Sequence, residues 1–416
     1  MKHWKNVCNK PALAQEDRGA LRILYHHRTQ AEDGQAVHIR SMIEALRHEG
    51  HEVREAALVP KADPETEAGP APKVEAKRSR FSPWALMGLV PRFARELAEY
   101  GYTVPATGRL VREASAFQPD VIYERYAFGN LAGVRAAKRL KLPLILEVNS
   151  PMVLELGRTR GLSFPRMADR IERQVFCGAD RVCVVTAVLG EMLVEMGVER
   201  ERLLVTPNGV HLEHYNNLDR EAARQDLGIA DTSGPVLGFV GYYRDWHRLD
   251  LVIDGLAAGG DLAHAHLVLV GAGPVEDELR EQAAKRGLAD RLHFAGTRPH
   301  HGIPKVLPAF DVALVPAINP YASPLKLHEY MAAKLPTVAP DQPNLREVLT
   351  HGKDALLVPP GDGDALLEAL GQLVRDSELR KRMGLAARAT IEEQNLTWRG
   401  NALRVVSAAE ALLERS

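Results

Sequence analysis

Short apolar runs alternate with longer amphipathic stretches along most of the chain. Runs rich in Val, Ile and Leu that are bounded by turn residues predict buried strands. They fall into two sets: 21–25, 51–53, 121–123, 143–147, 181–185 and 203–206 in the first half, and 236–240, 266–270, 292–294, 312–315, 337–339 and 355–358 in the second. Strands that alternate with helices form βαβ units, in which the strands run parallel. The pattern therefore predicts an α/β fold with two Rossmann-like, doubly wound domains in tandem.

Turn signals and a change in composition separate the two sets of strands. The turn Pro207-Asn-Gly-Val210 is followed by a polar stretch at 216–233. We therefore predict an N-terminal tail at 1–19, one domain at 20–207, a second at 208–395, and a closing helix at 396–416 that packs back across both domains. Residues 60–82 are rich in Pro, Ala, Glu and Lys, which favours a mobile insertion in the first domain.

The stretch 312–336 contains a candidate phosphate site. A predicted strand leads into a loop, and we place Ser323 at the N-cap and Pro324 at the first position of a helix from Leu325 to about 333. The amino end of such a helix offers free N–H groups and a positive dipole at the carboxyl end of a parallel strand. An ordinary capped crossover with solvated charges is the alternative.

Lys326 and Glu329 lie three residues apart and therefore share one face of this helix. A lysine at this position can contact a diphosphate, while the carboxylate of the glutamate can accept hydrogen bonds from sugar hydroxyl groups. Both residues are candidates for the catalytic site.

A second phosphate candidate follows the predicted strand at 236–240. Gly241 lets a ligand approach the backbone, and Arg244, His247 and Arg248 can each carry a positive charge. Arginine can bind a diphosphate through two parallel hydrogen bonds, which favours this loop as part of the same site as Lys326.

Two further loops at strand ends are candidates for nucleotide binding. Gly271 and Gly273 form a strand-to-helix turn, although this pair lacks the third glycine of the dinucleotide fingerprint. The backbone of Thr297 and the planar guanidinium of Arg298 are predicted to hold a base. In an open α/β sheet, ligands bind at the carboxyl ends of the strands, where both loops lie.

The first domain offers candidates for the acceptor side. Gly34 opens the first predicted helix, and His38 follows one turn later. Arg125, Glu147 and Asn149 lie at the carboxyl ends of predicted strands, so we expect them to line the same edge of the sheet. A surface histidine and residues that only brace their loops are the alternative interpretation.

Composition places the chain among globular proteins and argues against a general nucleic-acid binder. Of 416 residues, 45% are hydrophobic and 26% are charged, while the net charge is -1. Three cysteines without metal-ligand spacing favour a reducing, cytoplasmic environment. The aspartates at 362–364 look like a metal-binding pair, but Asp364 fits better as the N-cap of the next helix, so we predict no metal.

Residues 78–95 combine basic side chains with Trp84, Phe93 and several aliphatic residues. This composition is typical of a helix that lies on an anionic membrane or contacts a lipid-linked acceptor. No apolar run approaches the roughly 20 residues that a membrane-spanning helix needs, so we expect peripheral contact only. A core helix beside a basic loop is the alternative.

Six motifs in a fixed order resemble those of a known enzyme family. They are Gly34-Gln-Ala-Val-His38, Pro207-Asn-Gly-Val210, Phe239-Val-Gly241 with Trp246-His247, Val270-Gly-Ala-Gly-Pro274, Ser323-Pro-Leu-Lys-Leu-His-Glu-Tyr-Met-Ala332 and Leu357-Val-Pro-Pro-Gly-Asp362. In these motifs the chain resembles the family 4 glycosyltransferases of the GT-B fold, which are retaining enzymes that use nucleotide sugars. The resemblance implies two Rossmann-like domains that face each other across a cleft.

The resemblance also implies roles for individual residues. Glu329 would bind the ribose of the donor nucleotide, while Arg244, Lys326 and the backbone of 323–325 would hold the diphosphate, bordered by Gly34. Configuration would be retained, and the nucleotide-diphosphate sugar would be a co-substrate, so no cofactor is expected. The expected acceptor is a glycan or a lipid-linked glycan, as in polysaccharide synthesis.

Some positions depart from the family pattern. The family often has two glutamates separated by seven residues, and Tyr321 occupies the first of these positions. His247 stands close to where many relatives place a lysine, and Arg125 and Asn149 lie where several relatives carry histidines. Two alternatives therefore stay open: a nucleotide-sugar epimerase of similar fold, and a catalytically silent subunit that binds nucleotide sugar.

Overall fold

The computed structural model describes residues 19–29, 34–57 and 91–415. The predicted insertion at 60–82, residues 1–18 of the predicted tail and residues 78–90 of the segment 78–95 lie outside this part of the chain. Contacts divide the chain into two compact units. The N-terminal unit contains the described residues up to Val184, those at 189–205 and those from Ala402 onward, and the C-terminal unit contains 185–188 and 206–401.

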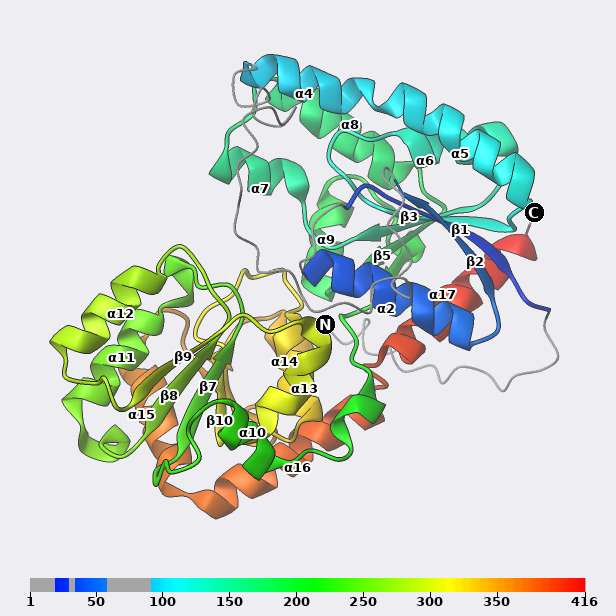
Figure 1. Cartoon of the computed structure of the whole chain (residues 1–416). Coiled ribbons are helices and arrows are strands. Elements are labelled where there is room, and N and C mark those ends of the chain that lie inside the picture. Colours follow the sequence, from blue (N-terminus) through cyan, green and yellow to red (C-terminus); the bar gives the residue numbers. More distant parts are fainter. Residues whose placement is uncertain (1–18, 30–33, 58–90, 416) are drawn as a thin grey trace. The chain divides into compact units, whose positions relative to one another are not determined.

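The N-terminal unit is built on a six-stranded sheet in the order β2-β1-β3-β4-β5-β6, with every neighbouring pair parallel. Figure 1 shows helices on both faces of this sheet. The strands are β1 (Arg22–His27), β2 (Glu52–Ala57), β3 (Val121–Arg125), β4 (Leu144–Val148), β5 (Arg181–Val184) and β6 (Leu203–Val205). The helices are α2 (Gly34–His48), α4 (Arg92–Gly101), α5 (Thr103–Phe117), α6 (Ala132–Leu140), α7 (Met152–Thr159), α8 (Pro165–Cys177) and α9 (Ala187–Glu195).

The C-terminal unit has a second parallel six-stranded sheet, in the order β12-β11-β10-β7-β8-β9. Its strands are β7 (Val236–Val240), β8 (His266–Val270), β9 (Leu292–Gly296), β10 (Val312–Leu314), β11 (Thr337–Pro340) and β12 (Ala355–Val358). Its helices are α10 (Arg220–Asp226), α11 (Leu249–Ala258), α12 (Glu276–Lys285), α13 (Ile303–Val306), α14 (Leu325–Ala332), α15 (Gly363–Arg375) and α16 (Ser377–Glu393). Short 3-10 turns include η3 (Leu212–Tyr215), η4 (Asp245–His247) and η6 (His300–Gly302).

The last helix, α17 (Trp398–Leu413), belongs to both units, because its first residues count with the C-terminal unit and the rest with the N-terminal unit. The prediction that this helix packs back across both domains stays a prediction. Within each unit, the predicted α/β fold with a doubly wound parallel sheet is confirmed.

Each sheet is buried on both faces, which explains why the sequences of its strands are unbroken apolar runs. Alternate residues of β7 enter different core clusters: Val236 and Val240 pack in one, and Leu237 and Phe239 pack in the other. Successive side chains of a strand point to opposite faces, so a sheet covered by helices on both sides needs apolar residues at every position.

Each sheet has one point at which the strand order reverses. In the N-terminal unit β1 is flanked by β2 and β3, and in the C-terminal unit β7 is flanked by β8 and β10. The loops that leave the carboxyl ends of such neighbouring strands run in opposite directions and leave a crevice, where ligands of this fold class bind. Ligands are therefore expected to contact the loops after β1 and β3 in the N-terminal unit and after β7 and β10 in the C-terminal unit.

Local details correct two predicted helix caps. The N-cap of α14 is Pro324 and not Ser323, whose hydroxyl instead accepts a hydrogen bond from the backbone N–H of Asn208 at 3.1 Å. The N-cap of α15 is Asp362 and not Asp364, because Asp362 accepts from the N–H of Ala365 at 2.9 Å. A sequence with several serine or aspartate residues allows a helix to begin at more than one position, and the surrounding contacts decide which position is used.

Candidate functional site

In the C-terminal unit, α14 and the loop after β7 meet at the crevice. The ammonium of Lys326 lies 3.8 Å from the centroid of the Phe239 ring, against Gly241. Gly241 has φ +145, and a Cβ at this position would lie 2.7 Å from Lys326 Nζ. A side chain at 241 would be strained and would displace the ammonium group, so glycine allows this approach. The predicted proximity of Gly241 and Lys326 is therefore seen.

Lys326 is a half-buried cation that no carboxylate neutralises within the described part of the chain. Burial lowers the pKa of Lys326 to about 7, although nearby Glu329 partly offsets this effect. Among the described residues, no carboxylate lies within ion-pair distance of its ammonium group. A desolvated amine without a counter-ion is stabilised in its charged form when an anion binds next to it.

Glu329, one turn after Lys326, is 5% exposed and is held from two other segments. Its Oε1 lies 2.7 Å from Nε2 of His300, in the turn that follows β9. The hydroxyl of Tyr215 forms a second hydrogen bond with this carboxylate. Burial of the hydroxyl raises its pKa most, and the negative charge of Glu329 raises it further. Neither His300 nor Tyr215 lies in a recognisable motif, so the sequence did not predict that either residue belongs to the site.

The loop after β7 supplies fewer positive charges than its sequence suggests. Arg244 is exposed, with its guanidinium 4.8 Å from the Tyr242 ring, whereas Arg248 is paired with Asp250 at 3.1 Å. His247 is buried, and burial, with Lys326 and Arg244, lowers its pKa to about 3. The expectation that His247 can be cationic in the site is therefore wrong near neutral pH.

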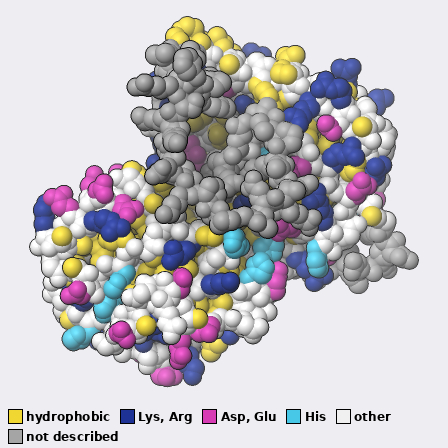
Figure 2. Space-filling view, viewed as in Figure 1, with side chains coloured by type: hydrophobic (Ala, Val, Ile, Leu, Met, Phe, Trp, Pro, Cys, Tyr) yellow, Lys and Arg dark blue, Asp and Glu magenta, His cyan; other side chains and the backbone are white. Residues whose placement is uncertain are grey.

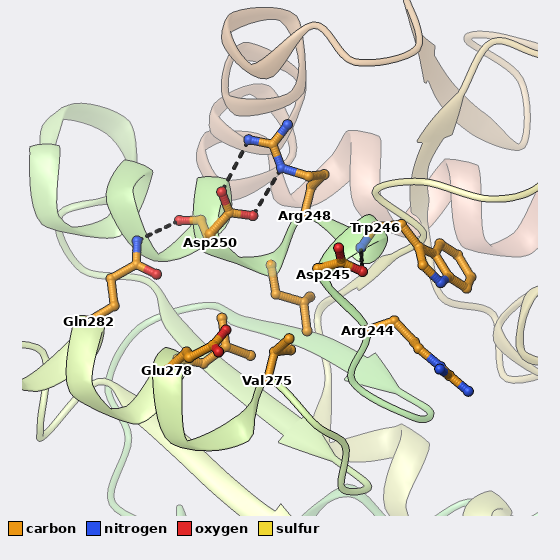
Figure 3. Close-up of a pocket in the computed structure, with 10 residues that line it drawn as sticks. Arg244, Asp245, Trp246, Arg248, Asp250, Val275, Glu278 and Gln282 are labelled. Atoms are coloured by element: carbon orange, nitrogen blue, oxygen red, sulfur yellow. Dashed lines mark hydrogen bonds and ion pairs between the residues drawn. The ribbon is translucent and has the colours of Figure 1, made fainter. Parts of the chain in front are cut away.

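Contacts with two aromatic rings, rather than charge, explain the presence of His247. Its ring lies 3.9 Å from that of Trp246 and 4.9 Å from that of Phe239, which in turn supports the Lys326 ammonium. Figure 3 shows Arg248 turned toward Asp250, while Arg244 and Trp246 extend away from the pocket beside them. That pocket, of about 400 Å³, is also lined by residues of α12 such as Gln282.

Gly271 and Gly273 have a packing role in the described chain. A Cβ on Gly271 would collide with the carbonyl of Gly241, and one on Gly273 would collide with the backbone of Tyr243. Hydrogen bonds from Gly241 N to Val270 O and from Tyr243 N to Ala272 O, both 2.9 Å, join these two loops. The two glycines thus hold the Gly241 loop in place.

Two asparagines from other segments hold the loop before α14 through hydrogen bonds. Asn208 donates through its backbone N–H to Ser323 Oγ at 3.1 Å and through its side chain to Ser323 O. Asn344 donates to Ala322 O at 2.7 Å. These contacts fix the chain that leads into Pro324 and Leu325, so the first turn of α14, with N–H groups that lack intrahelical partners, has a defined direction.

The remaining donor-side candidates lie on the loop after β9 and before α14. Thr297 is exposed, and Arg298 is 3.4 Å from Asp226, so its guanidinium already has a carboxylate partner. Tyr321, at the position of the family's first glutamate, is buried, and its carbonyl accepts from the hydroxyl of Thr186 at 2.8 Å.

In the N-terminal unit, the predicted acceptor-side residues come together beside the β1–β3 crevice. Nε2 of His38 lies 3.0 Å from Oε1 of Glu147, and Arg125 forms an ion pair with the same oxygen. The amide of Asn149 is 3.4 Å from Nδ1 of His38. Gly34 is exposed at the start of α2, one turn before His38.

Two tyrosines complete this cluster and were not anticipated. The hydroxyls of Tyr123 and Tyr25 donate to Oε2 of Glu147 at 2.9 Å and 3.3 Å. Burial by itself would raise the pKa of Glu147, but His38, Arg125 and the hydrogen bond from Tyr123 outweigh it and hold the pKa at about 2. Glu147 is therefore ionised and fixes the orientation of both His38 and Arg125.

Two family descriptions match the two halves of the chain. Residues 33–209 match the glycosyl transferase 4-like domain. Residues 219–390 match the glycosyl transferases group 1. The two matches together include every site residue that the sequence predicted, whereas Tyr25 and Tyr215 lie outside both.

Similar proteins are glycosyltransferases of several actinobacteria. A D-inositol 3-phosphate glycosyltransferase of Stackebrandtia nassauensis is 30% identical over 322 residues, which is 73% of this chain and 72% of the relative. That of Nocardia farcinica is 28% identical over 324 residues, 74% and 69% of the two chains. A 2-deoxystreptamine N-acetyl-D-glucosaminyltransferase of Streptomyces fradiae is 28% identical over 287 residues, 65% and 66% of the two chains.

Solved structures share the fold at low sequence identity. HepE of Anabaena in complex with UDP has a TM-score of 0.69 at 18% identity, covering 94% of this chain and all of that chain. Sucrose-phosphate synthase of Thermosynechococcus elongatus has a TM-score of 0.71 at 18% identity, covering 95% of this chain and all of the other. These structures and the two parallel sheets show the GT-B fold, and the two family matches with the 30% identical relative establish that the chain belongs to the family 4 glycosyltransferases.

Proposed function

We propose that this glycosyltransferase is a metal-independent, retaining hexosyltransferase that moves a sugar from a nucleotide-diphosphate sugar to a hydroxyl group of a glycan or lipid-linked glycan. The observation that carries the proposal is the half-buried, unneutralised ammonium of Lys326 against Gly241, at the strand-order reversal of the C-terminal sheet. An ammonium group whose charge the protein does not pair with a carboxylate favours the binding of an anionic ligand.

The chemistry follows from the charge that grows on the leaving group. As the bond between the sugar's anomeric carbon and the diphosphate breaks, negative charge moves to the diphosphate oxygens. Lys326, Arg244 and the amino end of α14 would stabilise that charge, which lowers the barrier only because the charge is larger in the transition state than in the bound donor. The departing diphosphate would then accept the proton of the acceptor hydroxyl as the new bond forms on the same face, which retains configuration.

Fixed positive groups replace a metal ion in this proposal. Lys326 and Arg244 lack carboxylate partners among the described residues, so both are available to diphosphate oxygens. The aspartate that most resembles a metal ligand, Asp362, already caps α15. In the N-terminal unit, the cluster of His38, Arg125, Glu147 and Asn149 offers hydrogen-bonding groups for the hydroxyls of an acceptor.

Direct assays test this proposal. In a thermal-shift screen, one nucleotide sugar should raise the melting temperature, because a ligand that binds only the folded state stabilises it by mass action. The transfer rate with that donor should be unchanged by a chelator, and the product should have the anomeric configuration of the donor. An inverted product, loss of activity with the chelator, or a modified donor sugar without any acceptor would each contradict the proposal.

We also propose that the protein is cytoplasmic and binds an anionic membrane surface peripherally, through α4 and the first turn of α5. Within the described ranges, no helix has the length and apolar character required to cross a membrane. Phe93, Leu97 and Val104 are 52%, 47% and 68% exposed, and Figure 2 shows hydrophobic side chains gathered at the top of the molecule, over α4. Arg92 and Arg95 flank them.

Helix α4 turns Glu96 inward in place of an apolar side chain, which explains the exposed apolar stripe. Glu96 is the buried residue of this helix, and its carboxylate accepts from the backbone N–H groups of Ser163 at 2.6 Å and Phe164 at 3.0 Å. Because this carboxylate is needed to satisfy the chain before α8, the apolar side of the helix is left facing outward. Apolar side chains with basic neighbours suit a lipid surface that carries negative charge.

Vesicle sedimentation tests the membrane proposal. Leu97→Glu should reduce binding to vesicles that contain phosphatidylglycerol by about tenfold, because a charge replaces a side chain that enters the lipid. Leu385→Glu is the matched control, since Leu385 is 51% exposed on α16 and lies outside the stripe. Equal binding by the wild type and Leu97→Glu, or no preference for anionic vesicles, would contradict the assignment.

A further inference from the structure

The carboxylate of Glu329 is clamped before any ligand binds. It is 5% exposed, and two donors reach it from segments far away in the sequence: Nε2 of His300 at 2.7 Å, and the hydroxyl of Tyr215. The His300 side chain is 39% exposed, so it extends from the surface of the C-terminal unit to a carboxylate that is almost completely covered. Two donors on one carboxylate restrict its rotation.

The number of acceptor positions limits what else this carboxylate can bind. An ionised carboxylate offers about four lone-pair positions, and His300 and Tyr215 occupy two of them. Two positions are left, which is the number that the two adjacent hydroxyls of a ribose require. A sugar that lacks one of these hydroxyls would leave a buried acceptor position unsatisfied, and such a mismatch weakens binding strongly.

His300 also lies in the appropriate segment of the chain. It follows Arg298 by two residues, in the loop after β9 where the sequence predicts that a nucleobase is held, and α14 carries Glu329 one turn after Lys326. The adjacent His301 is exposed and has no contact of this kind with Glu329 among the described residues.

We propose that His300 is a positioning residue that holds Glu329 ready for the vicinal hydroxyls of a ribonucleotide and thereby makes the site prefer ribonucleotides over 2′-deoxyribonucleotides. This inference rests on the proposed function and on the donor-ribose role that the family resemblance implies for Glu329. His300 itself does not contact the reacting atoms. It acts through the direction in which Glu329 presents its remaining acceptor positions.

Calorimetric binding of nucleoside diphosphates tests the inference. The probes are ADP, GDP and UDP, each with its 2′-deoxy counterpart, and the measured quantity is the ratio of the two dissociation constants for the base that binds best. The wild type should prefer the ribonucleotide by about tenfold or more, which is the usual cost of an unsatisfied buried polar group. His300→Phe should reduce this ratio to about threefold or less.

Matched variants separate positioning from a general loss of structure. His300→Gln keeps an N–H donor close to the place of Nε2 and should retain most of the preference. Tyr215→Phe removes only the second donor and should lower the ratio in the same direction as His300→Phe. His301→Phe changes the neighbouring exposed histidine and should leave the ratio unchanged.

The outcomes distinguish this inference from the function on which it rests. If the wild type prefers the ribonucleotide and both His300→Phe and Tyr215→Phe keep that preference, the positioning role is wrong while the role of Glu329 stands. If the wild type binds ribo- and deoxyribonucleotides equally, the assignment of Glu329 to the ribose fails, and this inference fails with it. Should no nucleoside diphosphate bind, the proposed function itself is refuted, and the inference with it.

Discussion

Replacing Lys326 with alanine is expected to lower the transfer rate from a nucleotide sugar by about 100- to 1,000-fold. Losses of this size follow when one preorganised donor to a developing negative charge is removed. Lys326 is the half-buried cation beside Gly241 and has no carboxylate partner in the described chain, so its charge is available to the diphosphate, and only Arg244 and the amino end of α14 would remain to stabilise the leaving group without it. Steady-state kinetics with the donor identified by thermal shift measure the effect.

Lys305→Ala is the control for this experiment, because Lys305 is an exposed lysine on α13 of the same unit. Its removal should leave the rate within about twofold, as expected for a solvated surface charge. Near-normal transfer by Lys326→Ala would exclude Lys326 from the site.

The pH dependence of donor binding gives a second readout of the same residue. The pKa of Lys326 is about 7 in the empty protein, so its positive charge is present below pH 7 and is lost as pH rises through 7. Affinity for a diphosphate should therefore fall from pH 6 to pH 8. Lys326→Arg keeps its charge throughout this range and should remove that dependence. His247 stays neutral over the same range, because its pKa is about 3.

Replacing Glu147 with glutamine is expected to lower the free energy of unfolding by about 3–5 kcal/mol, the usual cost of removing one partner from a buried ion pair. Arg125 would stay buried without its counter-charge, and His38 would lose the carboxylate that orients it. Urea unfolding, followed by circular dichroism, measures the change. Glu195→Gln, at the exposed end of α9, should change stability by less than about 0.5 kcal/mol.

The same carboxylate predicts how acid destabilises the protein. The pKa of Glu147 is about 2 in the folded chain, against an ordinary value of 4.5, so the folded state favours the ionised form. Its contribution to stability is therefore complete above pH 4.5 and is lost as pH falls toward 2. The wild type should lose more stability over this window than Glu147→Gln, which has no proton to bind there. Equal acid sensitivity of the two proteins would contradict the assigned pKa.

Much of the fold and part of the site could be predicted from local patterns. Apolar runs recovered the strands of both sheets, and the limits of β7, β8 and β12 agree with the predicted runs residue for residue. The βαβ alternation required parallel strands, which brings residues at the carboxyl ends of different strands to one edge. That rule is why His38, Arg125, Glu147 and Asn149 could be grouped before their contacts were known.

The tertiary structure decided which of these groups are charged, partnered or free. Burial between Trp246 and Phe239 makes His247 neutral, and Asp250 and Asp226 pair with Arg248 and Arg298. The contacts of Asn208 also determine where α14 begins.

By itself, the sequence determined the two α/β units, the family and the helix face that carries Lys326 and Glu329, because the periodicity of side chains along a strand or helix is a local property. Only the tertiary structure decided that Lys326 has no carboxylate partner among the described residues and that Glu329 is held by His300 and Tyr215. The physical reason is that desolvation and hydrogen bonding depend on groups brought together from distant parts of the chain, and no local pattern records which groups those are.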